Sequence, residues 1–281
     1  MKTDEALASR ANAVGAGPVR IRVDRVMDRL DMLLAKKDYA AAEAHLLYWL
    51  GESRSAGDDA AELAMINELM GFYRKQGVRE KAFEYARTGV GDFGSPGRLG
   101  DSIIYATTCL NAATVYKAFG EPEKALALYR ACHDIYTRRL SPDDLRFAGL
   151  YNNMGLALLE TGDSDGAENA FYDALRLQEP YGLSTAPDRA ITYLNLCDLY
   201  YFLANENGDD ENTIPGDVFQ NKIEECAEKA YELLSSPGVS HDAYFAFVCE
   251  KCFPVFGFYG FFKYKNDLEK WADEINSSYG S

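Results

Sequence analysis

The feature that most constrains this chain is a repeat, in which three asparagines lie 42 residues apart at Asn111, Asn153 and Asn195. The same spacing separates three alanines, Ala106, Ala148 and Ala190. The stretches LNAATVYKAFGEPEKALALY and YNNMGLALLETGDSDGAENAFY also align with each other. A fixed period of this length is typical of stacked helical hairpins, each of which buries its apolar face against its neighbours. The sequence therefore predicts an all-α solenoid, an architecture that typically presents a concave binding surface.

The clearest repeat spans residues 149–179 and predicts two helices with one apolar face each. The faces consist of Tyr151, Met154, Gly155 and Leu158 on the first helix and Ala167, Phe171 and Ala174 on the second. Gly162 is expected to end the first helix. Small residues at Gly155 and Ala167 would let the paired helices approach closely, while Phe171 would fill the gap to the next repeat.

These residues resemble the tetratricopeptide repeat, whose pattern places small residues at two fixed positions of each helical hairpin. The resemblance implies a right-handed superhelix of about six hairpins. The corresponding residue pairs are Leu30/Ala42, Met70/Ala82, Ala113/Ala125, Gly155/Ala167, Cys197/Ala227 and Phe256/Leu268. The spacing of 42 or 43 residues and the stretch HDIYTRRLSPDDLRFAGLYNNMGLALLE are similar to the kinesin light chain type of repeat. In that stretch we expect Ser141 to cap a helix, Pro142 to occupy its first position and Asp144 to complete a capping box.

The resemblance also suggests how the chain is organised. Residues 1–17 are expected to be a disordered tail, and residues 18–281 a single solenoid domain. An acidic insertion at 205–221 is interpreted as a solvated loop, with a partner contact or a calcium site as alternatives; the EF-hand pattern fails because its closing Glu is missing. Residues 241–277 are expected to form an aromatic-rich capping hairpin, whose first helix would run over 241–264 with a kink at Pro254.

The C-terminal aromatics are too dense to share one face, so we expect some to close the core and some to form an exposed docking patch. They are Tyr244, Phe245, Phe247, Phe253, Phe256, Phe258, Tyr259, Phe261, Phe262 and Tyr264. Cys249 and Cys252 form an isolated CxxC within the same stretch. A structural zinc site needs four ligands, so these cysteines are interpreted as core residues and no metal is expected.

Charge and motifs restrict the possible functions. The net charge of −15 argues against nucleic acid and anionic membranes, because no segregated basic stripe is evident in the sequence. The N-terminus lacks a signal-peptide core and no apolar run is long enough to span a bilayer, so a cytoplasmic location is expected. No nucleotide-binding or hydrolase motif is present, and the three histidines have no recognisable catalytic partner. We therefore expect neither catalysis nor a cofactor.

The resemblance implies that a groove lined by the first helix of each repeat binds peptides. The matching positions are Asn67, Glu68, Arg74, Lys75, Thr107, Asn111, Thr114, Lys117, Asn152, Asn153, Glu160, Asn195, Asp198 and Tyr201. An asparagine amide offers both donors and an acceptor to a peptide backbone. Alternatively, each asparagine bonds to the adjacent helix and sets the solenoid pitch, and the two roles are compatible. Arg74, Lys75 and Lys117 lie toward the N-terminal half of the groove and Glu160 and Asp198 toward the other half, which would orient a segment with an acidic end.

These observations predict a non-enzymatic scaffold that binds a protein or peptide partner. One alternative is a peptide-sensing regulator that resembles quorum-sensing receptors; since about 17 residues precede the first repeat, we expect any effector to be a separate chain. A second is a homo-oligomeric scaffold that docks through its aromatic C-terminal hairpin. A third is an enzyme whose site combines His133 with groove carboxylates.

Overall fold

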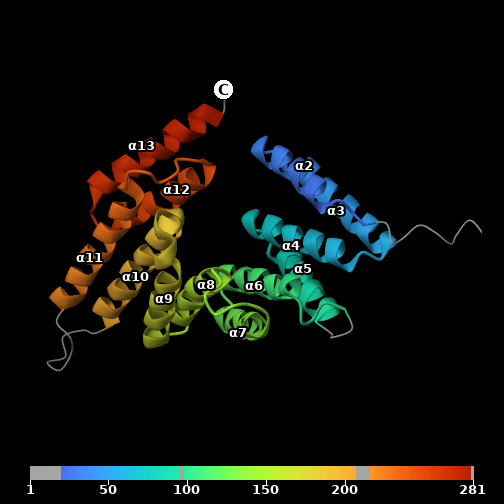
Figure 1. The fold of residues 1–281 in the computed structure, drawn as a ribbon, viewed down its shortest axis with the longest axis horizontal. Coiled ribbons are helices and arrows are strands. Elements are labelled where there is room, and N and C mark those ends of the chain that lie inside the picture. The colour runs from blue at the N-terminus through green and yellow to red at the C-terminus, as the bar shows by residue number, and fades with distance from the viewer. Residues whose placement is uncertain (1–19, 95–97, 207–215, 280–281) are drawn as a thin grey trace, which may run out of the picture. The chain divides into compact units, whose positions relative to one another are not determined.

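The computed structural model describes residues 20–94, 98–206 and 216–279, and these residues form helices joined by short turns (Figure 1). The helices are α2 (Val23–Ala35), α3 (Tyr39–Ala56), α4 (Asp59–Lys75), α5 (Arg79–Phe93), α6 (Ile103–Ala118), α7 (Pro122–Arg139), α8 (Arg146–Glu160), α9 (Ser164–Gln178), the short 3-10 helix η1 (Glu179–Thr185), α10 (Ala186–Glu206), α11 (Gly216–Ser235), α12 (Ala243–Phe258) and α13 (Phe262–Tyr279).

Consecutive helices pair into six hairpins within the described residues, beginning with α2/α3 and ending with α12/α13. Each of the six predicted residue pairs falls on the two helices of one hairpin, so the predicted all-α fold of helical hairpins is confirmed. Eleven of the twelve marker residues are buried to 2% exposure or less, and Gly155 is buried as well. The fold therefore follows the repeat that the sequence shows.

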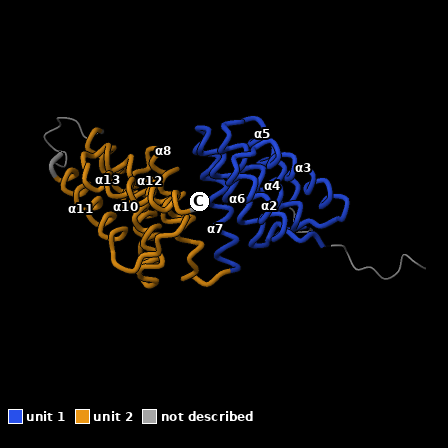
Figure 2. The backbone as a smooth tube through the Cα atoms, turned by 90° about the horizontal axis from the view of Figure 1, so that it is seen from above, with its two compact units in different colours: residues 1–139 blue, residues 140–281 orange. Residues whose placement is uncertain are grey.

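The chain divides into two compact units, residues 1–139 with α2–α7 and residues 140–281 with α8–α13 (Figure 2). A single solenoid domain over 18–281 stays a prediction. The tail expected at 1–17 lies outside the described residues, as does most of the acidic insertion predicted at 205–221. Helix α10 extends to Glu206 and α11 begins at Gly216, on either side of that segment.

Carboxylate and hydroxyl side chains cap five of the helix starts in the described residues and satisfy N–H groups that have no partner within the helix. The side chains of Asp38, Asp58, Ser102, Asp163 and Asp242 each accept a hydrogen bond from a first-turn N–H. Gly162 follows α8 with a φ of 82°, a left-handed conformation that glycine adopts without strain, which confirms its predicted place at the helix end.

The predicted start of α8 is wrong. Ser141 and Pro142 do not begin the helix; they belong to a turn in which the Ser141 carbonyl accepts from the Asp144 N–H at 3.0 Å. The helix begins at Arg146. Asp144 accepts from the Arg146 backbone N–H at 3.0 Å and pairs with its guanidinium at 2.7 Å. Because this side chain satisfies a helix-start donor locally, it replaces the expected Ser141 cap.

The α8/α9 hairpin shows why its crossing residue is glycine. A Cβ placed on Gly155 would lie 2.6 Å from Cε1 of Phe171, well inside van der Waals contact. Phe171 and Ala167 are fully buried on the facing helix α9. The predicted close approach at Gly155 is therefore confirmed, and the phenyl ring occupies the space that a larger residue in α8 would need.

A tyrosine, a carboxylate and a lysine join neighbouring hairpins of unit 1, and we call this arrangement a clasp. The Tyr73 hydroxyl of α4 donates to Glu43 of α3 at 2.6 Å. Lys81 of α5 donates to the same carboxylate at 2.7 Å, and its ammonium lies 4.7 Å from the Tyr73 ring centroid. The lysine thus neutralises the carboxylate that holds the tyrosine.

The same arrangement recurs in unit 2. There the Tyr200 hydroxyl of α10 donates to Glu168 of α9 at 2.6 Å, and Lys222 of α11 lies 3.4 Å from that carboxylate. The Lys222 ammonium sits 4.4 Å from the Tyr200 ring centroid. In both units the clasp therefore ties the first helix of one hairpin to the second helix of the hairpin before it.

Replacing Tyr73 by Phe is expected to lower the free energy of unfolding by about 0.5–1.5 kcal/mol at neutral pH, because the hydrogen bond to Glu43 is lost. Burial and Glu43 raise the pKa of Tyr73 to about 12. Since the fold favours the neutral phenol, this stabilisation is complete below pH 10 and is lost as the pH rises through 12. Urea unfolding across that range should show the stability gap between wild type and Y73F closing.

The matched control for Y73F is Tyr48→Phe, which removes the hydroxyl of an exposed tyrosine on α3. Y48F should unfold like the wild type at every pH. A gap between wild type and Y73F that stays constant from pH 9 to 12 would contradict the assignment of the raised pKa to the clasp.

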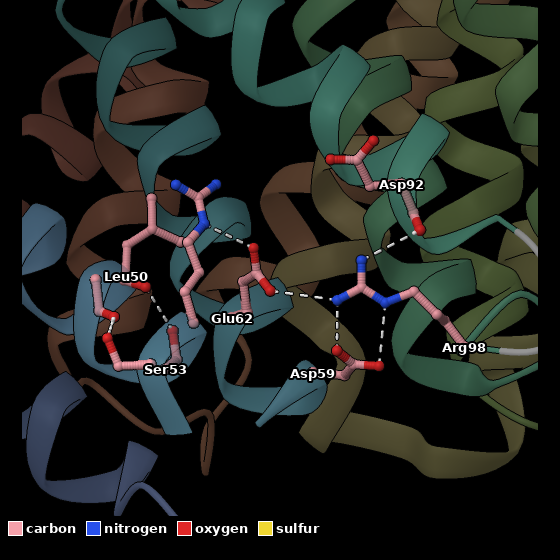
Figure 3. A network of polar contacts seen from close by, with 9 residues as sticks. Leu50, Ser53, Asp59, Glu62, Asp92 and Arg98 are labelled. Atoms are coloured by element: carbon pink, nitrogen blue, oxygen red, sulfur yellow. Dashed lines mark hydrogen bonds and ion pairs between the residues drawn. The ribbon is translucent and has the colours of Figure 1, made fainter. Parts of the chain in front are cut away.

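An arginine network fixes the segment that enters α6 (Figure 3). Arg98 bonds to the Asp59 carboxylate at the start of α4, lies 3.3 Å from Glu62 and donates to the Asp92 carbonyl. Its guanidinium carbon also stacks 3.9 Å from the centroid of the buried Phe93 ring. These contacts hold Arg98 against the beginning of α4 and the end of α5.

The first C-terminal helix is shorter than predicted. Helix α12 ends at Phe258 and not at 264, because Gly260 takes a φ of 85° and α13 starts at Phe262. Pro254 lies inside α12 without ending it. Phe245 and Phe256 are fully buried, whereas Phe258 and Phe262 are 65% and 64% exposed. The aromatics thus divide between core and surface.

Candidate functional site

A pocket of about 460 Å³ lies within unit 2, between the first helices of its three hairpins, α8, α10 and α12. Helix α10 packs against both of the others. The pocket is lined by Asn152, Asn153, Leu156, Ile191, Leu194, Asn195, Phe247, Lys251, Cys252 and Val255. Three of these residues, all asparagines, belong to the set predicted from the sequence.

Helical spacing explains how each helix reaches the pocket. Helix α8 presents Asn152 and Leu156, and α10 presents Ile191 and Asn195, in each case four residues apart. Helix α12 contributes residues at the same interval. Residues at this interval share one helix face, so three parallel stripes form an apolar floor edged by amides.

Two of the asparagines form a pair across neighbouring hairpins. The Asn195 amide nitrogen donates to the Asn152 carbonyl oxygen at 2.9 Å. Within the described residues, the Asn152 amide nitrogen and the Asn195 carbonyl oxygen make no further hydrogen bond. The pair therefore leaves the Asn152 amide nitrogen and the Asn195 carbonyl oxygen free at the pocket, a donor and an acceptor that match the C=O and N–H groups of a peptide.

The third asparagine of the pocket has a local role. The Asn153 amide nitrogen donates to the Gly149 carbonyl one turn earlier in α8, at 2.9 Å. Asn153 is the residue that lies 42 positions before Asn195 in the repeat, but the hydrogen bond of Asn195 goes to the preceding residue, Asn152. The hydrogen bond between α8 and α10 is the contact expected of a residue that sets the pitch. Gripping of a ligand stays a prediction.

Phe247 and Lys251 line the α12 side of the pocket together with Cys252 and Val255, and none of these residues was in the predicted groove. Phe247 is 46% exposed and stacks on Tyr244 with centroids 6.2 Å apart. The Lys251 ammonium lies 5.1 Å from the Phe247 ring centroid. Phe247 belonged to the predicted set of C-terminal aromatics. For Lys251, the sequence signal that could have placed it on the same helix face is its position four residues after Phe247.

The other predicted residues of unit 2 do not line this pocket. Asp198 accepts a hydrogen bond from the Tyr259 hydroxyl at 2.7 Å, and burial raises the pKa of its carboxyl group. Tyr201 packs edge-on against Phe258, with centroids 5.2 Å apart. Glu160 is exposed at the last position of α8 and makes other contacts. The α12/α13 turn therefore covers Asp198, which the repeat pattern placed in an open groove.

In unit 1, three of the predicted polar residues make hydrogen bonds within the protein. The Asn67 amide nitrogen of α4 donates to the Thr108 hydroxyl of α6 at 3.1 Å. The hydroxyls of Thr107 and Thr114 donate to carbonyls of their own helix, α6. Asn111 is half-buried on the same helix. Asn67 thus links two hairpins, and the threonine hydroxyls are already satisfied.

Glu68 and Lys75 of α4 line a separate pocket of about 310 Å³ in unit 1, whose floor includes Leu30, Leu46 and Phe72. Although the Glu68 side chain is partly exposed, desolvation by this pocket, and then the charge of Asp31, raises the pKa of its carboxyl group. Two further predicted residues, Arg74 and Lys117, are half-buried on α4 and α6. The predicted charge gradient involves both units and stays a prediction.

No group of three or more His, Cys, Asp or Glu side chains in the described part is placed to hold a metal ion. All six cysteines are free and buried, and burial raises the pKa of the Cys249 thiol to about 12. Within the same residues, no helix is both long and apolar enough to cross a membrane.

Comparison with known proteins finds the same kind of repeat in a family model and in solved structures. A family model described as tetratricopeptide repeat matches residues 106–145 and 147–179. The crystal structure of BtubC (BKLC) from P. vanneervenii is 16% identical, with a TM-score of 0.52 over 93% of this chain and 94% of that chain. A Podosopora anserina kinesin light chain structure with nearly identical TPR-like repeats is 15% identical, with a TM-score of 0.53 over 78% and 97%. No curated protein sequence matches this chain.

Proposed function

From the tetratricopeptide repeats at residues 106–145 and 147–179, we propose that this chain is a non-enzymatic scaffold that binds a protein segment. The described part of the chain folds throughout as helical hairpins of that kind. Repeats of this family generally mediate protein interactions. We propose that the bound segment lies in the pocket between α8, α10 and α12.

The observation that carries this proposal is the unpaired donor and acceptor left by the Asn195–Asn152 hydrogen bond at the edge of an apolar pocket. A peptide backbone bonding to those amides would direct a side chain onto Leu156, Ile191 and Val255. Apolar pockets with a few convergent polar groups are the usual form of a binding site. The exposed Phe247 adds an aromatic wall, a residue type enriched in interfaces.

The test begins with affinity capture of the partner and synthesis of its bound segment. Fluorescence anisotropy should then show that Asn152→Ala combined with Asn195→Ala weakens binding of that segment by at least about tenfold, the loss expected when two backbone hydrogen bonds are removed. Because both amides are removed together, neither asparagine is left without its hydrogen-bond partner in the other.

The control combines Asn169→Ala and Asn221→Ala, which remove two exposed amides of α9 and α11 outside the pocket. This variant should bind like the wild type. Equal binding by N152A/N195A and the wild type would overturn the proposed site. If N152A/N195A lowers the melting temperature and spares binding, the amides set the pitch only.

A second candidate function is self-association through the C-terminal hairpin. The observation that favours it is the exposure of Phe258 and Phe262, at the end of α12 and the start of α13, to 65% and 64%. Large aromatic side chains left on a surface often mark a contact site.

A further inference from the structure

Unit 1 contains a strongly basic pocket that the repeat pattern does not assign. It lies between α2 and α3, has a volume of about 570 Å³ and is lined by Arg20, Arg22, Arg25, Arg29, His45 and Trp49 above the buried Val26. No segregated basic stripe is evident in the sequence, whose net charge is −15, so this pocket was not predicted. We call this site the arginine pocket.

Helix geometry gathers these cations. Arg22 precedes α2, and Arg25 and Arg29 lie three and seven residues further on, so they share one helix face. The His45 Nε2 atom of α3 lies 3.0 Å from the Val26 carbonyl, which fixes the imidazole ring. One turn further along α3, Trp49 contacts that ring edge-on, with centroids 6.4 Å apart.

Few of the arginines that line the pocket form ion pairs with the described residues. Arg22 pairs with Asp24 at 2.6 Å, whereas Arg20, Arg25 and Arg29 make no ion pair with any residue that the structure describes. The nearby Asp58 accepts from the backbone N–H groups of Ile21 and Ala61 and caps α4. Asp24 also interacts electrostatically with Arg25 without forming an ion pair. Three of the four arginines that line the pocket are therefore free of ion pairs with the described residues.

We propose that the arginine pocket binds an acidic segment of a partner protein, in which glutamate or aspartate side chains pair with Arg20, Arg25 and Arg29 and an apolar side chain packs on Trp49. The guanidinium fork matches a carboxylate with two parallel hydrogen bonds, which makes arginine well suited to this recognition. The site involves unit 1 only and does not depend on the pocket of unit 2.

Two observations favour an acidic peptide over nucleic acid. The remaining surface carries the negative charge of the chain, and it would repel the continuous phosphates of a polynucleotide that extends beyond the pocket. A short acidic segment places its charges only where the arginines are. The half-buried indole beside Val26 also offers an apolar wall for one side chain.

The test uses the full chain and two labelled synthetic peptides of equal length, one with glutamates flanking a leucine and one with glutamines in their place. We expect the acidic peptide to bind and the glutamine peptide to bind at least about tenfold more weakly. Arg25→Gln combined with Arg29→Gln should weaken binding of the acidic peptide by about tenfold and flatten its salt dependence, because two of the cations that line the pocket are removed.

The matched control is Arg130→Gln with Lys263→Gln, which removes the same total charge from exposed, unpaired side chains of α7 and α13. It should leave binding unchanged. Intrinsic fluorescence localises the ligand: in a Trp271→Phe background only Trp49 reports, and its emission should shift when the acidic peptide binds. Circular dichroism should show that each variant is folded.

Three results would overturn the proposal. The first is equal weakening by the control pair, which would mean that net charge alone attracts the peptide. The second is equal binding of the glutamate and glutamine peptides. The third is tighter binding of a single-stranded oligonucleotide than of the acidic peptide, which would assign the pocket to phosphates.

Discussion

A protein carrying Phe171→Ala is expected to lose about 3–5 kcal/mol of its free energy of unfolding, because the ring is fully buried between the helices of its hairpin. The ring lies directly against Gly155 of α8, so its removal leaves a cavity at the point where the two helices approach most closely. Urea unfolding monitored by circular dichroism measures the loss.

The same contact predicts how a second change combines with the first. Gly155→Ala alone should cost about 1–3 kcal/mol, since the added Cβ would overlap the Phe171 ring. Adding G155A to F171A should cost much less, because the ring is no longer there to be displaced. A double-mutant cycle over the four proteins measures this difference as a coupling free energy.

Gly149→Ala is the matched control on the same helix. A Cβ at Gly149 meets no atom within 4 Å, so this change should stabilise the protein by about 0.5–1 kcal/mol through helix propensity. If G155A and G149A shift stability by the same amount and sign, the close approach of Phe171 to Gly155 is not what requires glycine there.

Replacing Phe256 by Ala is expected to be equally costly, at about 3–5 kcal/mol. Phe256 is fully buried in α12, where its ring contacts Phe261 and Tyr264 edge-on at centroid distances of 6.4 and 5.6 Å. These three aromatics hold α12 against α13, so their loss should uncouple the C-terminal hairpin. Differential scanning calorimetry should detect a lower unfolding temperature in F256A than in the wild type.

Phe258→Ala, two residues further along, provides the comparison. Its ring is 65% exposed and touches Tyr201 edge-on, so F258A should cost less than about 1.5 kcal/mol, the upper value for such an aromatic pair. Sedimentation velocity on the same protein tests self-association: a dimer of the wild type that dissociates in F258A would support docking through this hairpin. Stability losses of equal size in F256A and F258A would contradict the division of the aromatics into core and surface.

The repeat predicted the hairpins because the distance between paired helices limits the size of the side chains at the marker positions. Small residues are needed where paired helices approach as closely as they do at Gly155 and Ala167, and in the clearest repeats that requirement is visible at a fixed sequence interval. The start of α8 could not be read in this way. A serine and a proline suit a helix start in general, but the Asp144–Arg146 contact decides between two nearby starts.

The binding residues were only partly predictable, because contacts distant in sequence determine which groove positions remain open. Asp198 matches a groove position, but Tyr259, 61 residues later, covers it. Lys251 lines the unit 2 pocket because α12 packs against α10, and its own repeat is too degenerate to give the register. The arginine pocket likewise requires His45 and Trp49 of α3 beside α2.

The Tyr73–Glu43–Lys81 clasp has a consequence for how the molecule opens. Of the hairpins described, α2/α3 has only one neighbour in sequence, the α4/α5 hairpin. The hydrogen bond from the Tyr73 hydroxyl of α4 to Glu43 of α3 holds the two hairpins together. In linear arrays, end modules fray before central ones, since each is held by a single interface. Amide hydrogen exchange in α2 and α3 should therefore proceed through local unfolding at a lower free energy than in α4 and α6, and any partner bound to the arginines would slow that exchange by holding the end module closed.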